Sequence, residues 1–204
     1  YLEPPNSWTF AIQPIQAITA YAKQKGIITM IDNSYATPLY QPVISMGIDL
    51  AMQTATKYIG GHSDTLRGVL SGSKAMIKKI FDMDYLAIGS GMQPFNAWLM
   101  LRSLRTMPVR LERITQTTST IADFLKQQPQ IESIIYPFDE SFDQYELANN
   151  QMKPVGGLVT IILQTREREK IVQFCERLQH FLIAVSWGGH ESLVLPKCAG
   201  IPSE

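Results

Sequence analysis

One lysine, Lys57, lies in a segment whose composition suits chemistry better than regular structure. The segment reads TATKYIGGHSD, residues 54–64, and follows directly on a short apolar run. Its hydroxyl groups can donate hydrogen bonds, and its glycine pair allows a ligand to approach the backbone closely. A lysine amine in such a place can form a Schiff base with a carbonyl compound. Taken alone, a lysine in this position is more often an ordinary solvated surface charge than a catalytic residue.

A carboxylate, Asp32, follows an earlier apolar run in the segment MIDNSYATP. Ligands of open α/β sheets bind outside the carboxyl ends of the strands, and a carboxylate at that edge suits a cationic group of a ligand. The local alternative is that Asp32 caps a turn or a helix in the sequence DNS. This residue by itself does not decide between the two.

The two residues are more informative together than apart. If the two apolar runs are neighbouring parallel strands, the loops that carry Asp32 and Lys57 meet at one edge of the sheet, where Thr54, Thr56 and Ser63 add hydroxyl groups. Such an edge suits a ligand with a cationic nitrogen, a phosphate and an aldehyde, and pyridoxal phosphate has all three. A nicotinamide site is the weaker alternative, because no glycine fingerprint follows a predicted strand.

The elements around these residues alternate between helices and buried strands. Apolar residues recur at helical intervals between Pro14 and Gly26, which predicts one amphipathic helix. Apolar runs without alternation indicate strands buried on both faces, as in a parallel sheet covered by helices. We therefore expect an α/β fold with a mostly parallel sheet sandwiched by helices. Its strands are predicted at IITMI (27–31), GIDLAMQT (47–54) and RGVLSGS (67–73), with a helix in SKAMIKKIF (73–81).

A second, smaller α/β unit is predicted after a pair of helices. These helices occupy residues 93–105 and 111–125, on either side of a break at Pro108. We place residues 1–107 in a large domain and residues 108–204 in a smaller C-terminal domain. The smaller unit has predicted strands at IESIIY (131–136), GGLVTIIL (156–163) and LIAVSW (182–187), and a helix over residues 171–181.

The composition of the chain indicates which classes of partner it is suited to bind. The chain has 204 residues, 45% of them apolar, and 18 basic side chains balance 18 acidic ones. Because neither sign forms a long block, the sequence does not predict a nucleic-acid surface or a polybasic membrane patch, and small neutral or zwitterionic partners fit better. Cys175 and Cys198 have no metal-like or framework spacing, which favours two reduced thiols in a cytoplasmic protein.

Targeting and membrane segments are not found in the sequence. We find no apolar stretch of membrane-spanning length and no basic-then-apolar signal segment. The chain opens at Tyr1 without a methionine and closes at Glu204 without a helix-ending pattern. We therefore expect it to be part of a longer protein.

Four sequence words, IDNSYATP, TATKYIGGHSD, LRSLRTMPVRLERI and SWGGHES, span nearly the entire chain. Together they resemble the Cys/Met-metabolism family of pyridoxal-phosphate enzymes, which includes cystathionine β-lyase, cystathionine γ-lyase, cystathionine γ-synthase and methionine γ-lyase. The second word is highly specific. The resemblance implies an aspartate-aminotransferase-like fold (PLP fold type I), pyridoxal 5′-phosphate as cofactor, and homotetramers built as dimers of dimers.

The resemblance also assigns roles to particular residues. It implies that Lys57 is the Schiff-base lysine and that Asp32 pairs with the pyridine nitrogen of the cofactor. Thr54 and Thr56 would contact the phosphate. Ser186 would help to orient the substrate carboxylate, with the alternative that it only caps the preceding strand.

Further residues distinguish members of the family weakly. Ser7 lies among the cofactor-binding positions, in YLEPPNSWTF, where most members have an asparagine; the form is closer to bacterial cystathionine β-lyases. SWGGHES resembles their WGGYES, with His190 in place of the tyrosine. Trp187 would line the substrate pocket, with packing alone as the alternative. His62 is expected to have a supporting or structural role and is not assigned as a base.

The implied activity is a carbon–sulfur lyase acting on cystathionine or a related sulfur amino acid. β-Elimination would give homocysteine, pyruvate and ammonia; cystathionine γ-synthase, γ-lyase and methionine γ-lyase activities are the close alternatives. The chain lacks the family's N-terminal part, with its glycine phosphate loop and ring-stacking tyrosine. The arginine that binds the substrate carboxylate would also lie beyond Glu204, and such a bidentate pair is a strong element of recognition. An inactive cofactor-binding fragment is therefore the alternative from another class.

Overall fold

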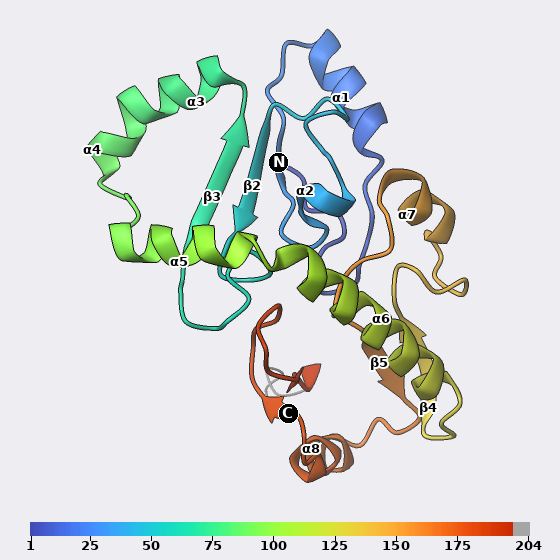
Figure 1. Ribbon diagram of the computed structural model, residues 1–204. Helices are drawn as coiled ribbons and strands as arrows, with labels where there is room; N and C mark the ends of the chain where they lie inside the picture. The colour runs from blue at the N-terminus through green and yellow to red at the C-terminus, as the bar shows by residue number, and fades with distance from the viewer. Residues whose placement is uncertain (198–204) are drawn as a thin grey trace.

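The computed structural model describes residues 1–197. Its first unit is built on a three-stranded sheet in the order β1 (Met30–Asp32), β2 (Leu50–Thr54), β3 (Gly68–Gly72). β1 and β2 are parallel, β3 runs antiparallel to β2, and Leu2 adds a parallel bridge beside Ile31. In Figure 1, helix α1 (Ile15–Gln24) lies on one side of the strands and α3 (Lys74–Ile80) on the other.

The first predicted strand starts later than expected, and the end of α1 explains why. Gly26 has a φ of +64°, and the N–H of Ile27 donates to the carbonyl of Ala22 at 2.9 Å. The N–H of Gly26 likewise donates to Lys23, so the helix ends in the hydrogen-bond pattern of a Schellman motif. Ile27 therefore completes the helix end, both Ile27 and Ile28 are exposed, and the strand begins only at Met30.

A run of helices connects the two halves of the chain. The side chain of Ser73 caps α3 by accepting from the N–H of Met76 at 3.2 Å. The helical run is then, in order, the π-helical segment η1 (Phe81–Tyr85), α4 (Leu86–Ile88), α5 (Pro94–Leu104) and α6 (Met107–Lys126). Pro108 stands in the first turn of α6, so the predicted break falls between α5 and α6. The π-helical segment was not predicted.

The second half contains two short sheets and shorter elements than the sequence predicts. β4 (Ile131–Ile135) pairs antiparallel with β5 (Thr160–Leu163), and β6 (Leu182–Ile183) pairs parallel with β7 (Leu193–Val194). The prediction of a strand over residues 182–187 was wrong beyond Ile183: Ala184 still donates to the carbonyl of Val194 at 3.2 Å, and the chain then turns so that Trp187 packs against Tyr58 of the first unit. Helix α8 (Arg168–Arg177) also ends before the predicted residue 181, and α2 (Thr37–Tyr40) and α7 (Tyr145–Gln151) are additional short helices.

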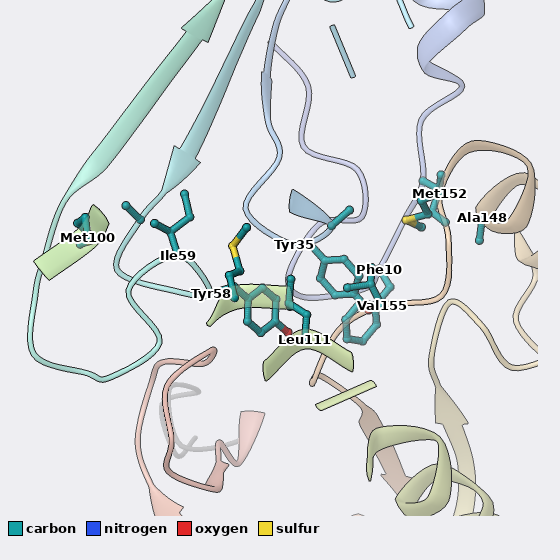
Figure 2. Packing of buried hydrophobic residues seen from close by; sticks show 13 residues of the cluster. Phe10, Tyr35, Tyr58, Ile59, Met100, Leu111, Ala148, Met152 and Val155 are labelled. Atoms are coloured by element: carbon teal, nitrogen blue, oxygen red, sulfur yellow. The ribbon is translucent and has the colours of Figure 1, made fainter. Parts of the chain in front are cut away.

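The hydrophobic core joins the two halves. One buried cluster takes Phe10 and Tyr35 from the first half, Leu111 from α6, and Val155 from the second half, as Figure 2 shows. A second cluster lies under β1 and α1, and a third lies between α6 and β4. Apolar packing therefore continues across residues 107 and 108. The domain boundary placed there stays a prediction.

Two further features bear on function. Within residues 1–197, no helix is long and apolar enough to cross a membrane, and no three His, Cys, Asp or Glu side chains form a metal-binding group. Cys175 is buried, whereas Cys198 lies outside the described residues.

The buried end of β1 offers a test of this fold. Ile31 is 0% exposed in the core beneath the sheet, and Ile28 is 65% exposed three residues earlier. Ile31→Ala should lower the free energy of unfolding by about 3 kcal/mol, because it removes buried methyl groups and leaves a cavity. Ile28→Ala is the matched control and should cost less than about 1 kcal/mol. Urea denaturation measures both, and equal losses would contradict the packing described here.

Candidate active site

The carboxyl ends of β1 and β2 bring the predicted cofactor residues to one edge of the sheet. The two strands pair in parallel with Asp32 opposite Met52, which confirms their predicted relation. β1 ends at Asp32 and β2 ends at Thr54, three residues before Lys57. The loops are also joined directly, since the backbone N–H of Thr54 donates to the hydroxyl of Ser34 at 2.6 Å.

Asp32 is half-buried at this edge and has a local hydrogen bond. Its Oδ1 accepts from the backbone N–H of Ser34 at 2.9 Å, so the turn-capping role considered from the sequence is present. In the part of the chain that the structure describes, this is the one hydrogen bond to the Asp32 carboxylate. The second carboxylate oxygen therefore keeps its capacity to accept from a cationic N–H.

The Lys57 amine is half-buried and lies against a loop from the far end of the chain. It donates to Ser186 Oγ at 3.0 Å and lies 5.3 Å from the centre of the Trp187 ring. Burial lowers the pKa of Lys57, and no carboxylate among residues 1–197 comes within 4.0 Å of its amine to oppose this. A lowered pKa increases the fraction of neutral amine, which is the form that attacks a carbonyl.

The turn that carries Lys57 is held from below by Arg110 of α6. The guanidinium donates to the carbonyl of Tyr58 at 2.9 Å and to that of Ile59 at 3.4 Å. Gly61 has a φ of +67°, and a side chain there would collide with the same guanidinium. The sequence analysis did not identify this role of Arg110, although the residue lies within the quoted word LRSLRTMPVRLERI.

The two threonines just before Lys57 make different contacts. The hydroxyl of Thr56 accepts from the backbone N–H of Arg67 at 2.9 Å and donates to its carbonyl at 3.3 Å, closing the connection from β2 to β3. Thr54 is half-buried and joins the Asp32 loop through its backbone. Their predicted contacts with a phosphate stay a prediction.

Trp187 and Gly188 bring residues from the far end of the chain against the Lys57 turn. The Trp187 ring meets Tyr58 edge-on at 5.1 Å and lies 6.5 Å from Tyr35. Gly188 has a φ of +84°, and a Cβ there would lie 3.0 Å from the backbone of Lys57 and of Tyr58. Tyr58 is itself fixed, because its hydroxyl accepts from the N–H of Gly157 at 2.6 Å.

Three other predicted residues lie in different settings. Ser7 is exposed in a turn that the Asn6 side chain caps, in the segment that follows the bridge at Leu2. The ring of His62 is 2.5 Å from the carbonyl of Gly60, within its own turn, which fits a structural role. His190 is exposed, with its Nε2 3.7 Å from the neighbouring Glu191 carboxylate.

A hollow of about 660 Å³ lies elsewhere, and none of the predicted site residues lines it. It opens beside α6 and is lined mainly by α6 side chains together with Tyr40, Tyr136, Phe138 and Pro154. The Lys57 edge is therefore a separate feature of the molecule, and it carries the reactive groups that this hollow lacks.

Sequence reasoning missed the contact that closes the Lys57 turn on its other side. Ser63 was predicted as a hydroxyl donor, but its partner Glu191, 128 residues away, was not identified. Ser34, which joins the ends of β1 and β2, was also missed. Ser34 lies in the motif IDNSYATP and Glu191 in SWGGHES, so the motifs contained both residues but did not indicate which residues they contact.

Comparison with known proteins identifies the family. The family model described as Cys/Met metabolism PLP-dependent enzyme matches residues 1–200, and the chain belongs to this family. Cystathionine beta-lyase of Lactococcus lactis subsp. cremoris (strain MG1363) is 34% identical over 195 residues, which are 95% of this chain and 50% of that protein. The cofactor of the family is pyridoxal 5′-phosphate.

Solved structures confirm the predicted fold. The crystal structure of cystathionine gamma-lyase from Lactobacillus plantarum complexed with L-serine has a TM-score of 0.91 and 31% identity, covering 99% of this chain and 54% of that one. Cystathionine gamma synthase from Xanthomonas oryzae pv. oryzae in complex with cystathionine gives 0.91 and 29%, covering 97% and 51%. The chain thus has the fold of these enzymes and spans about half of their length.

The residues present fit the cofactor of this family. Within residues 1–197 the half-buried Lys57 amine has no carboxylate partner, which suits an aldehyde, and the spare oxygen of the Asp32 carboxylate suits a protonated ring nitrogen. Both groups follow strands that end at the same edge of the sheet. The chemistry of the donors and their common location therefore agree with the family.

Gly188→Ala should lift the loop that carries Trp187 away from the Lys57 turn. The added Cβ would meet backbone atoms, which cannot move aside as a flexible side chain can. With Trp8 and Trp98 replaced by phenylalanine, acrylamide quenching reports on Trp187 alone and should increase. Gly26→Ala is the matched control, because Gly26 also has a positive φ but a Cβ added there would meet no atom within 4 Å. Unchanged quenching in Gly188→Ala would contradict the close approach.

Proposed function

We propose that the protein acts as a pyridoxal-phosphate-dependent carbon–sulfur lyase of the trans-sulfuration type. The proposed reaction is β-elimination from cystathionine or a related sulfur amino acid, giving homocysteine, pyruvate and ammonia. The observation that carries the proposal is the half-buried Lys57 amine, placed on the edge of a parallel strand pair and contacted by Ser186. Family membership and the similarity to a cystathionine beta-lyase support the same reaction class.

Each residue of the edge has a proposed role toward the cofactor. When bound, pyridoxal phosphate supplies an aldehyde for a lysine and a ring that accepts electrons from the substrate. Lys57 would hold the aldehyde carbon, and Asp32 would keep the ring nitrogen protonated through its charge. Hydroxyl groups of Thr54, Thr56 and Ser7 are the proposed contacts to the remainder of the cofactor.

The substrate side of the site uses the loop that begins at Ser186. The hydroxyl of Ser186 is proposed to orient the substrate carboxylate, and Trp187 to form the apolar wall of the pocket. The Lys57 amine is proposed to act as the base that would take the proton from the substrate Cα. The lowered pKa of Lys57 supports this role as base, because a larger fraction of its amine is unprotonated.

γ-Chemistry is the close alternative, because relatives of both kinds resemble this chain. The matched proteins include a beta-lyase, a gamma-lyase and a gamma synthase at comparable identity. A γ-enzyme needs a second proton removed, from Cβ, before its leaving group departs. Product analysis separates the two, since pyruvate indicates β-elimination and α-ketobutyrate indicates γ-elimination.

The length of the chain motivates a second candidate, a cofactor-binding part without turnover. The chain covers about half of its relatives, so residues supplied by the other half would complete the site. We propose that the complete protein is a cytoplasmic homotetramer, a dimer of dimers. In this second case the chain would bind the cofactor but release no product.

Lys57→Ala should abolish both cofactor binding and turnover. Pyridoxal phosphate bound to the unmodified chain should give a visible absorbance band that borohydride removes, and peptide mass analysis should place the reduced cofactor on Lys57. Lys23→Ala, which changes an exposed lysine of α1, is the control and should keep the band. A borohydride-sensitive band of unchanged intensity in Lys57→Ala would rule out the assignment.

Asp32→Asn should separate binding from turnover. The amide keeps the size of the carboxylate but cannot hold a cationic ring nitrogen by charge. We expect cofactor absorbance to remain, and product formation to fall at least about tenfold, which corresponds to about 1.4 kcal/mol in the barrier. Asp82→Asn, in the exposed pair with Lys78, is the control. Product formation within twofold of the unmodified protein would refute the proposed pairing.

A further inference from the structure

Two segments that are far apart in the sequence enclose the Lys57 amine. One is the turn from Lys57 to Ser63, and the other is the loop from Ser186 to Glu191. Besides the packing of Trp187 and Gly188 against Tyr58 and Lys57, two side-chain hydrogen bonds join them: Lys57 donates to Ser186 Oγ at 3.0 Å, and Ser63 donates to Glu191 Oε2 at 2.6 Å. The first hydrogen bond involves the proposed reactive amine, and the second hydrogen bond has no role in the chemistry proposed above.

The contact between Ser63 and Glu191 joins an exposed serine to a half-buried glutamate. The Glu191 side chain is 26% exposed, and the hydrogen bond from Ser63 is the main cause that lowers the pKa of Glu191. A side chain at Gly189 would collide with both the Ser63 hydroxyl and the Glu191 carboxylate. The groups that face this carboxylate are the Ser63 hydroxyl, the backbone N–H groups of His190 and Glu191, and, at 3.7 Å, the ring of His190.

Regular structure does little to hold the Ser186 loop in place. β6 and β7, which flank it, contain two residues each and pair only with one another among the described strands. The residues between them form no helix or strand. Because loop residues without backbone ladders rely on tertiary contacts for their position, these two hydrogen bonds help to set where Ser186 and Trp187 lie, together with the packing of Trp187 and Gly188.

We propose that Glu191 is a positioning residue, which holds the Ser186–Trp187 loop over the Lys57 amine through its hydrogen bond with Ser63. This inference rests on the proposed function, in which Ser186 and Trp187 form the substrate side of the site. Glu191 bonds to Ser63, whereas the Lys57 amine bonds to Ser186. The effect of Glu191 on the reaction is exerted through the loop, by keeping Ser186 Oγ at one place relative to Lys57 Nζ.

The test measures the Lys57 amine and the Trp187 ring without cofactor or activity. Reductive methylation as a function of pH, followed by mass analysis of the Lys57 peptide, gives the midpoint of amine titration. Acrylamide quenching of Trp187, with Trp8 and Trp98 replaced by phenylalanine, gives the position of the loop. The midpoint is used rather than the plateau rate, because greater accessibility would raise the rate by itself.

Glu191→Ala and Ser63→Ala should both increase the quenching of Trp187 and raise the Lys57 midpoint, because water returns to the amine when the loop lifts. The double variant should do no more than either single variant, since both remove one interaction. Glu191→Gln should restore the behaviour of the unmodified chain, because its amide oxygen still accepts from Ser63. Glu132→Ala, which removes the exposed partner of Arg166, is the control and should leave both readings unchanged.

Unchanged readings in Glu191→Ala would overturn the proposal. A change in Glu191→Ala without a matching change in Ser63→Ala would also overturn it, because the hydrogen bond could not then be the cause. If Glu191→Ala fails to fold, as judged by circular dichroism, Ser63→Ala and Glu191→Gln still decide the outcome. Failure of the proposed function is distinct, because it appears as absent cofactor absorbance in the unmodified chain, whatever these readings are.

Discussion

The parallel pairing of β1 with β2 is the constraint on which the site depends. With Asp32 opposite Met52, both strands end at one edge, and the two loops that follow must share it. The hydrogen bond from the Thr54 backbone to Ser34 fixes their spacing at that edge. A shift of one residue in this register would send the side chain of Asp32 to the opposite face of the sheet, because strand side chains alternate.

The Lys57 turn gains its rigidity from residues that do no chemistry. Arg110 binds the carbonyl groups beneath it, and Gly61 provides the space for that guanidinium. Trp187 and Gly188 close the other side by direct packing. A lysine has a long and flexible side chain, so a defined amine position requires such a frame, and the same frame excludes enough water to lower the pKa of Lys57.

The features that could be predicted from the sequence depend on local patterns or on short motifs of the family. The alternation of helices and buried runs predicted β2, β3 and α1, and the word TATKYIGGHSD singled out Lys57. The sequence did not predict that the strand after Ile183 would stop, because that depends on the packing of Trp187 against Tyr58, a residue far away in the chain. The Schellman end of α1, which removed Ile27 from β1, was readable in principle from Gly26. The contacts of Arg110 and Glu191 were not, because they are long-range pairings between loops and helices.

The proposed roles of Lys57 and Asp32 do not distinguish β- from γ-chemistry. An amine that takes a proton from Cα and a carboxylate that holds the ring nitrogen serve both kinds of elimination equally. The two reactions differ only in what happens further along the substrate side chain, so the difference must arise where that side chain lies. In the proposed site, that place would be bounded by the loop with Trp187 and His190; the His190 ring is exposed beside Glu191. Under the proposed function, substrate choice would be governed by the position of this loop more than by the identity of Lys57 or Asp32.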